Sequence, residues 1–290
     1  MPAVVNVNGQ ISNEDEARIS VFDHGFLYGE GVYETLLTYN KKIFLLDRHI
    51  KRLRRSADQI NLSVPLADQE LESRIQATLD EAALGDTPTY IRILLTRGIG
   101  PLTYDLKACL SPSLVIIVRP HTFPSEKLAT KGALVALVSI IRNHPRSVNP
   151  LIKSNNLMNN ALAMQEGYSK GANESLMCNY RGELTECSQS NFFLVKDGQI
   201  RTPELGSGLL AGITRGFLLE LGPEIGIPTS EAVLHQDDIL KSEEAFFTST
   251  TKEIVPVVRV DDHVIGEGVP GPITKRLMAA FREKIEHLCR

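Results

Sequence analysis

The sequence is poor in the features that mark secreted, disulfide-stabilised and metal-binding proteins. Its 290 residues include no tryptophan, aromatic residues make up 6%, and only four cysteines occur. The cysteines, at positions 109, 178, 187 and 289, form no Cys-x-x-Cys pair and have no metal-ligand spacing. We therefore expect free thiols in a reducing cytoplasm and no bound metal.

Long apolar runs and an excess of one charge are also missing. No run approaches the roughly 20 apolar residues that span a bilayer, and the first residues lack the layout of a signal peptide. The formal net charge is −4, from 35 acidic and 31 basic residues, so we expect no binding to nucleic acid or to a membrane. Apolar residues, at 42%, suffice for a buried core.

Strand-like and helix-like patterns alternate along the whole chain. Asn8-Gly9, between alternating residues, predicts a hairpin turn. Asp47 is the expected N-cap of a helix that buries Ile50, Leu53 and Ala57. Both halves of the chain mix strands with helices, which predicts an α/β or α+β fold.

A change in composition near the middle of the chain predicts two domains. Residues 121–132 contain a proline, a glycine and several charged side chains, which is typical of a linker. We therefore expect a small N-terminal domain over residues 1–120 and a C-terminal domain over residues 133–290. The boundary between two such domains is a common place for a binding site.

Lys153 is the first candidate for chemistry. It follows a strand-like run, Gly132–Ile141, and precedes a segment with a helical apolar stripe at Leu157, Ala161, Met164 and Tyr168. A lysine at such a strand-to-helix corner points inward, and burial lowers the pKa of a lysine and frees its neutral amine. That is the chemistry of a Schiff-base lysine. A solvated surface lysine is the ordinary alternative.

Two further stretches predict a site for phosphate. Leu210–Arg215 is a glycine loop that leads into a helix start, where free N–H groups and the helix dipole favour anions. Thr248–Thr251 places four consecutive hydroxyls at the end of an apolar strand. Taken singly, each stretch also fits an ordinary loop or turn.

A carboxylate and an arginine complete this set. Glu183 or Glu186, ahead of the strand-like residues 192–196, could pair with a cationic ring nitrogen. Arg52 lies in a basic helical run and could direct its guanidinium onto a phosphate instead of solvent. A Schiff-base lysine, a carboxylate for a ring nitrogen and phosphate-binding groups are together the requirements of pyridoxal 5'-phosphate.

In their order and in their residues, these stretches resemble the class IV, or fold-type IV, pyridoxal-phosphate aminotransferases over essentially the whole chain. The most specific pieces are Ile152-Lys153-Ser154, Leu184-Thr185-Glu186, Ser190-Asn191-Phe192, Gly212-Ile213-Thr214-Arg215 and the hydroxyls ahead of Glu253-Ile254. The resemblance implies a two-domain α/β (mixed α+β) fold with a smaller N-terminal domain and the cofactor in the cleft. It also implies a homodimer or higher homo-oligomer.

The resemblance assigns roles to individual residues. Lys153 corresponds to the Schiff-base lysine, which also moves the proton at the substrate Cα, and Glu186 to the partner of the pyridine nitrogen. Leu210 corresponds to the residue that packs on the ring face. Phosphate contacts are implied for Arg52, Ile213, Thr214, Ser249 and Thr250, and substrate contacts for Tyr33, Tyr90, Arg92 and Thr251.

The substrate signals conflict. Tyr90-Ile91-Arg92 is similar to branched-chain aminotransferases, whereas Val32-Tyr33-Glu34-Thr35 is similar to the D-amino-acid branch. The loop Gly100–Tyr104, however, lacks the arginine and histidine of that branch, and Leu157-Met158 replaces a tyrosine of the bacterial branched-chain enzymes. We expect transamination between a branched-chain L-amino acid (leucine, isoleucine or valine) and 2-oxoglutarate.

Three alternatives remain open from the sequence. A D-amino-acid or R-amine transaminase would use the same residues, and an aminodeoxychorismate-type lyase would use the same lysine to release pyruvate. A binding module that kept the fold without catalysis would not need Lys153, Glu186, Thr214 and Thr250 together.

Overall fold

In the computed structural model of the chain, residues 3–289 are described, and they pack into two compact units. The first unit runs to Thr122 and takes in Ile152–Asn156 and the end of the chain from Leu288. The second comprises Phe123–Leu151 and Leu157–His287. Among the described residues, no helix is long and apolar enough to cross a membrane.

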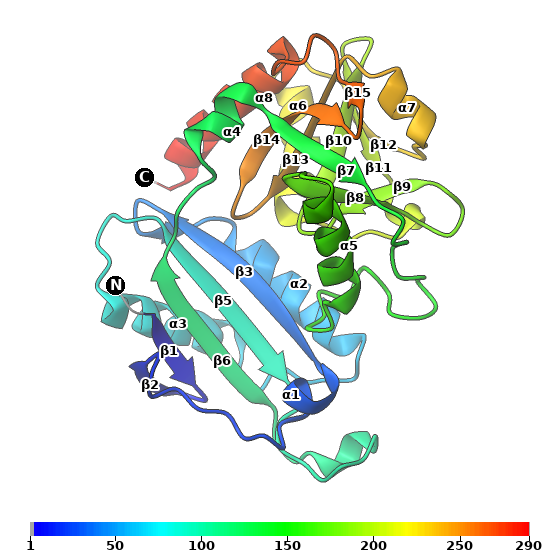
Figure 1. Cartoon of the computed structure of the whole chain (residues 1–290). Helices are drawn as coiled ribbons and strands as arrows, with labels where there is room; N and C mark the ends of the chain where they lie inside the picture. The colour runs from blue at the N-terminus through cyan, green and yellow to red at the C-terminus, as the bar shows by residue number, and fades with distance from the viewer. Residues whose placement is uncertain (1–2, 290) are drawn as a thin grey trace. The chain divides into compact units, whose positions relative to one another are not determined.

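The first unit is built on a six-stranded sheet in the order β2-β1-β6-β5-β3-β4, with every neighbouring pair antiparallel (Figure 1). Its strands are β1 (Val4–Val7), β2 (Gln10–Asn13), β3 (Gly31–Tyr39), β4 (Lys42–Ile43), β5 (Thr89–Thr96) and β6 (Ser113–Pro120). The predicted turn at Asn8-Gly9 is confirmed, because both residues have positive φ and join β1 to β2.

Two helices cover one face of this sheet, α2 (Leu46–Asp58) and α3 (Asp68–Ala82), and a short helix, α1 (His24–Tyr28), precedes β3. The expected burial of Ile50, Leu53 and Ala57 on α2 is confirmed. The expected N-cap at Asp47 is wrong: α2 begins at Leu46, and Asp47 lies in its first turn. A carboxylate there still favours the helix through its dipole.

Alternation along β3 separates two faces of the sheet. Val32 and Leu36 belong to the core formed with α2 and α3, and Glu34 points the same way because strand side chains alternate. Tyr33 and Thr35 therefore point to the opposite face, and Thr35 is paired with Arg92 on β5. Polar and aromatic side chains thus gather on the face that α2 and α3 leave uncovered.

The second unit is built on a nine-stranded sheet in which six strands close into a ring. The order β10-β13-β14-β7-β8-β9 returns to β10 through the pair Asn191 and Glu186. Its strands are β7 (Ala133–Leu137), β8 (Glu174–Cys178), β9 (Leu184–Cys187), β10 (Asn191–Lys196), β11 (Gln199–Pro203), β12 (Thr229–Ala232), β13 (Glu244–Ser249), β14 (Glu253–Val260) and β15 (His263–Val264). Closure brings the carboxylate of Glu186 to the seam of the ring.

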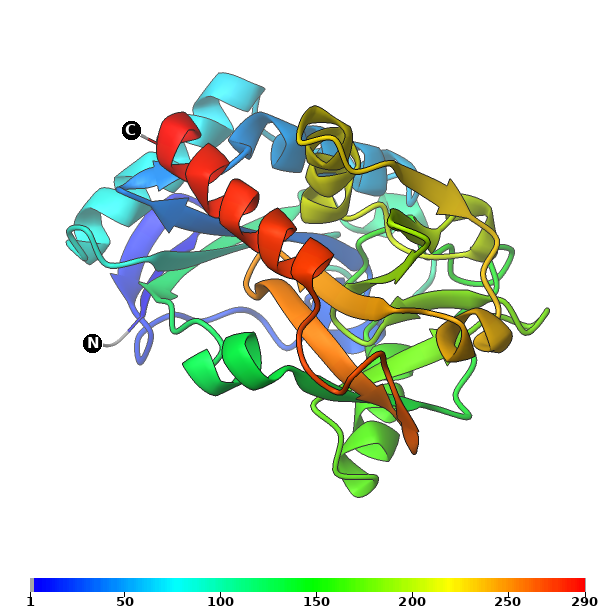
Figure 2. The same cartoon turned by 90° about the horizontal axis from the view of Figure 1, so that it is seen from above.

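Helices surround this ring. They are α4 (Glu126–Lys131), α5 (Met158–Ser169), α6 (Ile213–Glu224), α7 (Gln236–Leu240) and α8 (Pro272–Leu288). In Figure 2, α8 (red) passes beside β14 (orange), and the two line a common pocket. Phe217 of α6 meets Phe281 of α8 edge to face, with ring centres 5.8 Å apart. The stretch predicted to be a linker contains α4.

The surroundings of Lys153 differ from the predicted strand-to-helix corner. β7 ends at Leu137 and α5 begins at Met158, so neither element adjoins the lysine. The predicted stripe on α5 is also only partly right, because Ala163, Met164 and Gly167 are buried while Ala161 and Tyr168 are exposed.

Candidate active site

Lys153 is held as part of a short extended segment along β3 of the first unit. The Tyr33 N–H donates to the Lys153 carbonyl at 2.9 Å, and the Asn155 N–H donates to the Gly31 carbonyl at 2.9 Å. The Lys153 N–H donates to the Ser56 hydroxyl of α2 at 3.2 Å. The backbone of the lysine is therefore fixed on both sides, and its half-buried side chain extends from a rigid base.

Of the predicted substrate residues, Tyr33 lies beside this lysine, Arg92 lies beside Tyr33, and Tyr90 contacts Arg92. The Lys153 Nζ atom is 4.4 Å from the centre of the Tyr33 ring, and the Arg92 guanidinium carbon is 4.1 Å from it. Arg92 also donates a long bond, 3.4 Å, to the Tyr90 hydroxyl. The ring of Tyr33 thus lies within cation–π distance of both the amine and the guanidinium.

Arg97, which follows β5, binds protein groups with its guanidinium. It is buried, and its Nε donates to Glu30 at 2.7 Å. Its two terminal nitrogens donate to the carbonyl groups of Ile60 and Asn61. The guanidinium of Arg97 is therefore used by protein groups, whereas Arg92 contacts the side chains of Tyr33 and Tyr90.

Arg52 lies on the other face of the same sheet, in a buried charged cluster. Its Nε and Nη2 donate to the two oxygens of Glu34 at 2.7 and 2.8 Å, and the Nδ1 of His49 lies 2.7 Å from the same carboxylate. Burial alone would raise the pKa of Glu34, but the Arg52 guanidinium and His49 hold it well below its usual range. Burial lowers the pKa of His49, so the neutral ring donates its Nδ1–H to Glu34.

In the second unit, Glu186 is the centre of a buried polar network. Arg142 donates its Nε to one carboxylate oxygen of Glu186 at 2.9 Å. The other oxygen accepts from the Leu210 N–H at 3.1 Å and from the Asn191 side-chain amide at 3.3 Å. Glu186 was predicted to contact the ring nitrogen and Leu210 the ring face. The two residues are hydrogen-bonded to each other. Glu183 pairs with Arg181 and Asn179 instead.

The glycine loop after Leu210 leads to an uncapped helix start. Helix α6 begins at Ile213 with Gly212 as its N-cap, and this glycine has no side chain that could accept from the N–H groups of the first turn. Gly212 is required because a Cβ there would collide with the Asn191 Oδ1. The predicted donors, Ile213 and Thr214, thus stand where free N–H groups and the dipole favour an anion.

The predicted hydroxyl cluster forms the turn between β13 and β14. The Thr248 hydroxyl donates to the Glu253 carbonyl and so helps to join β13 to β14. The hydroxyls of Ser249 and Thr251 lie 3.5 Å apart, and Thr250 stands between them at the tip of the turn. The side chains of Ser249, Thr250 and Thr251 are half-buried at this end of the ring.

These donor groups fit pyridoxal phosphate by their chemistry. A helix start and a hydroxyl turn suit a phosphate, a buried carboxylate suits a protonated ring nitrogen, and a held lysine amine suits an aldehyde. The structure brings these groups together within each unit: Lys153 with Tyr33 and Arg92 in the first, and Glu186 with Leu210 in the second.

The family is shown by comparison with known proteins. Residues 31–260 match the family described as amino-transferase class IV, and the chain belongs to this family. Enzymes of this family use pyridoxal phosphate. A provisionally named branched-chain-amino-acid aminotransferase of Methanocaldococcus jannaschii is 35% identical over 280 residues, covering 96% of this chain and 95% of that protein. A D-alanine aminotransferase of Bacillus licheniformis is 33% identical over 278 residues, covering 96% and 95%.

Solved structures agree with this fold. The branched-chain aminotransferase of Escherichia coli aligns with a TM-score of 0.93 at 28% identity, covering 98% of this chain and 94% of that chain. The T.th. branched-chain aminotransferase, solved with pyridoxamine 5'-phosphate, aligns with the same score and identity, covering 100% and 96%. The predicted mixed α/β fold and the predicted aminotransferase activity are therefore both confirmed.

Several residues of these clusters were not predicted. Glu34, His49, Arg142 and Asn191 received no individual role from the sequence, although they surround Arg52 and Glu186. One signal was available for Glu34, a charged residue on the apolar side of an alternating strand. Arg142 carried no such signal, because it lies in an irregular segment.

Proposed function

We propose that this aminotransferase moves the amino group of a branched-chain L-amino acid to 2-oxoglutarate. The observation that carries the proposal is the contact of both Lys153 and Arg92 with the ring of Tyr33. This arrangement offers a carboxylate-binding guanidinium next to a proton-carrying amine. The names of the Methanocaldococcus jannaschii relative and of the structural neighbours support the substrate class.

Each residue then has a definite task. Arg92 binds the substrate carboxylate, aided by the Tyr90 hydroxyl, and so orients the Cα–H bond toward Lys153. The Lys153 amine would take the proton from Cα as general base and, as general acid, pass it to a carbon of the cofactor, as transamination requires. When bound, the cofactor supplies an electrophilic carbon and a ring that accepts an electron pair. Glu186, fixed by Arg142 and the Leu210 N–H, holds a proton at the ring nitrogen.

The phosphate of the cofactor has a separate set of proposed contacts. We assign it to the N–H groups at the start of α6, Ile213 and Thr214, and to the hydroxyls of Ser249 and Thr250. Arg52 is assigned to the phosphate by resemblance. Its Nε and Nη2 are bonded to Glu34, which fixes the plane of the guanidinium. Thr251 is assigned to the substrate.

A D-amino-acid transaminase is the second candidate. It is supported by the Bacillus licheniformis relative, named D-alanine aminotransferase, and by Val32-Tyr33-Glu34. A panel of L- and D-amino acids with 2-oxoglutarate or pyruvate as acceptor separates the two. Leucine, isoleucine and valine should be the best donors, and activity on D-alanine without activity on leucine would contradict the proposal. Pyruvate release without an acceptor would indicate a lyase.

We further propose a cytoplasmic homodimer. Exposed apolar side chains of the first unit gather in two segments that meet at the bridge between Asp23 and Ile99. They are Val21, Phe22, Phe26, Ile99, Leu102, Tyr104, Leu106 and Leu110. Such a patch is unusual on a monomer and fits burial against a second copy. Light scattering should give twice the chain mass of 32.0 kDa, and a monomeric mass would contradict the proposal.

Substitution of Glu186 by Gln tests the ring-nitrogen assignment. We expect cofactor to remain bound, while kcat falls by roughly 10²-fold because a neutral amide holds the ring proton less strongly. The measurement is single-turnover kinetics with leucine, together with the absorbance of bound cofactor. Glu183→Gln is the matched control, since that carboxylate is held by Arg181. An unchanged rate in Glu186→Gln would mean that another group holds the ring nitrogen.

A further inference from the structure

A second buried carboxylate in the ring, Glu174, has no role in the mechanism above. It is the first residue of β8 and is completely buried. One carboxylate oxygen accepts from the Ser175 N–H at 3.0 Å and from the Ser188 hydroxyl. The other accepts from the Ser190 hydroxyl at 3.1 Å and from the Lys252 Nζ at 2.8 Å. Both carboxylate oxygens of Glu174 therefore accept hydrogen bonds, as a buried carboxylate requires.

The partners of Glu174 belong to two different turns. Ser188 and Ser190 lie in the turn between β9 and β10; Asn191 follows this turn directly, and Glu186 precedes it by one residue. Lys252 ends the turn between β13 and β14 that carries the hydroxyl side chains of residues 249–251. One carboxylate thus links the turn beside Glu186 to the hydroxyl turn.

We propose that Glu174 is a positioning residue, which through Lys252 fixes the hydroxyl turn for phosphate and through Ser188 and Ser190 fixes the turn beside Glu186. The inference rests on the proposed assignment of the hydroxyl turn, residues 249–251, to the phosphate. Its subject is the placement of the two turns, since neither Glu174 nor Lys252 is assigned to contact the cofactor.

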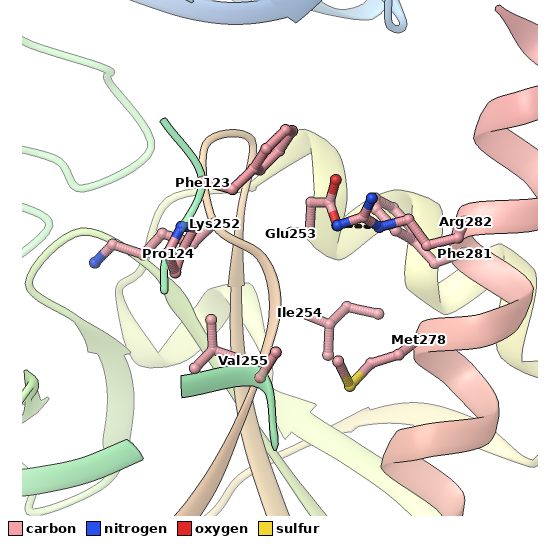
Figure 3. A pocket seen from close by; sticks show the side chains of 10 residues that line it. Phe123, Pro124, Lys252, Glu253, Ile254, Val255, Met278, Phe281 and Arg282 are labelled. Atoms are coloured by element: carbon pink, nitrogen blue, oxygen red, sulfur yellow. Dashed lines mark ion pairs between the residues drawn. The ribbon is translucent and has the colours of Figure 1, made fainter. Parts of the chain in front are cut away.

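The backbone bond across the hydroxyl turn is long, and side-chain contacts add to the antiparallel pairing of Ser249 with Glu253. The Lys252 N–H reaches the Ser249 carbonyl over 3.3 Å, a long bond. Glu253 next to it has φ of 54°, a left-handed conformation that is unfavourable for a residue with a side chain. Figure 3 shows Arg282 of α8 reaching Glu253 as an ion pair. Lys252 with Glu174 is the second anchor, and its ammonium also lies 5.4 Å from the Phe247 ring centre.

The test compares the binding of pyridoxal phosphate with that of pyridoxal, which lacks the phosphate, to the apo form of the full chain. Dissociation constants are read from the absorbance of bound cofactor. In Lys252→Met we expect the constant for pyridoxal phosphate to rise by roughly tenfold, the factor that about 1.4 kcal/mol represents, while that for pyridoxal changes less than about twofold. Glu174→Gln should weaken both, and pyridoxal phosphate more, because it releases both turns.

Two further variants make the result decisive. Glu244→Gln is the matched control: Glu244 is a buried carboxylate at the other end of β13 that accepts from the N–H groups of Ile273 and Thr274. Glu244→Gln should lower the free energy of unfolding but leave the ratio of the two dissociation constants unchanged. Thr250→Val tests the phosphate assignment itself, and its ratio should rise.

The outcomes separate the two ideas. If the ratio rises in Thr250→Val but not in Lys252→Met, the positioning role of Glu174 and Lys252 is overturned and the phosphate assignment stands. If it rises in Lys252→Met but not in Thr250→Val, the turn is positioned as inferred and Thr250 is not the phosphate ligand. If neither variant changes the ratio, the turn does not bind phosphate and both ideas fail. Should Glu174→Gln not fold, Lys252→Met decides alone.

Discussion

Replacement of Lys153 by Ala should lower the rate of transamination by more than about a thousandfold, because it removes the proton carrier and the only amine held over Tyr33 in the described residues. The fold should survive. The lost side chain is half-buried, and its contact with an aromatic face stabilises by about 0.5–1 kcal/mol. Steady-state assays with leucine and 2-oxoglutarate, together with urea unfolding, measure both quantities.

Lys170→Ala is the control for this variant. Lys170 lies at the end of α5, pairs with Glu166 and is exposed, so its loss should leave activity unchanged. Reduction of the loaded enzyme with borohydride provides an independent measurement, since it fixes the cofactor on its lysine. A label on any residue other than Lys153, or full activity in Lys153→Ala, would refute the assignment.

Replacement of Glu34 by Gln should lower the free energy of unfolding by about 3–5 kcal/mol, the usual cost of removing one partner from a buried ion pair. Glu34 has no exposed surface, and the variant leaves the Arg52 guanidinium buried without its counter-charge. Urea unfolding near pH 7 gives the difference. Asp86→Asn, which breaks the exposed pair with Lys41, is the matched control and should have no measurable effect. An equal effect in both variants would contradict the argument.

The pH dependence of this difference has a definite sign. The pKa of Glu34 is lower in the folded protein than its ordinary value of 4.5. The unfolded chain therefore binds the proton more tightly, so the stability from Glu34 is complete above pH 4.5 and is lost as the pH falls below it. The difference in free energy of unfolding between the wild-type chain and Glu34→Gln should become smaller as the pH falls below 4.5. If this difference in free energy of unfolding stays constant down to pH 3, the conclusion that Glu34 is ionised in the folded protein is wrong.

Local sequence patterns predicted elements more reliably than the surroundings of single side chains. The turn at Asn8-Gly9 was predicted because asparagine and glycine tolerate the positive φ found there, and the start of α6 was predicted from the glycine loop that leads into it. The cap of α2 was misplaced by two residues, since Leu45 adopts the left-handed conformation there in spite of its side chain. The backbone conformation of Leu45 is therefore set by packing and not by the local preference of leucine.

The surroundings of Lys153 could not be predicted for a related reason. A residue between a strand-like and a helix-like segment suggested a corner, whereas the structure places it along β3, a strand more than 100 residues earlier in the chain. The same holds for the Glu174–Lys252 pair, in which the two partners are 78 residues apart. Pairings over such separations leave no periodic signal in a single sequence.

By itself, the sequence determined the mixed fold class, the order of most strands and helices, and the chemical groups required for pyridoxal phosphate. These follow from local patterns and from the types of residue present. Only the tertiary structure decided which groups meet: Lys153 and Arg92 on Tyr33, Arg52 and His49 on Glu34, and Glu186 with Leu210 at the seam of the ring. The physical reason is that charge pairing and burial depend on distance in space, which sheet closure and strand register set and sequence separation does not.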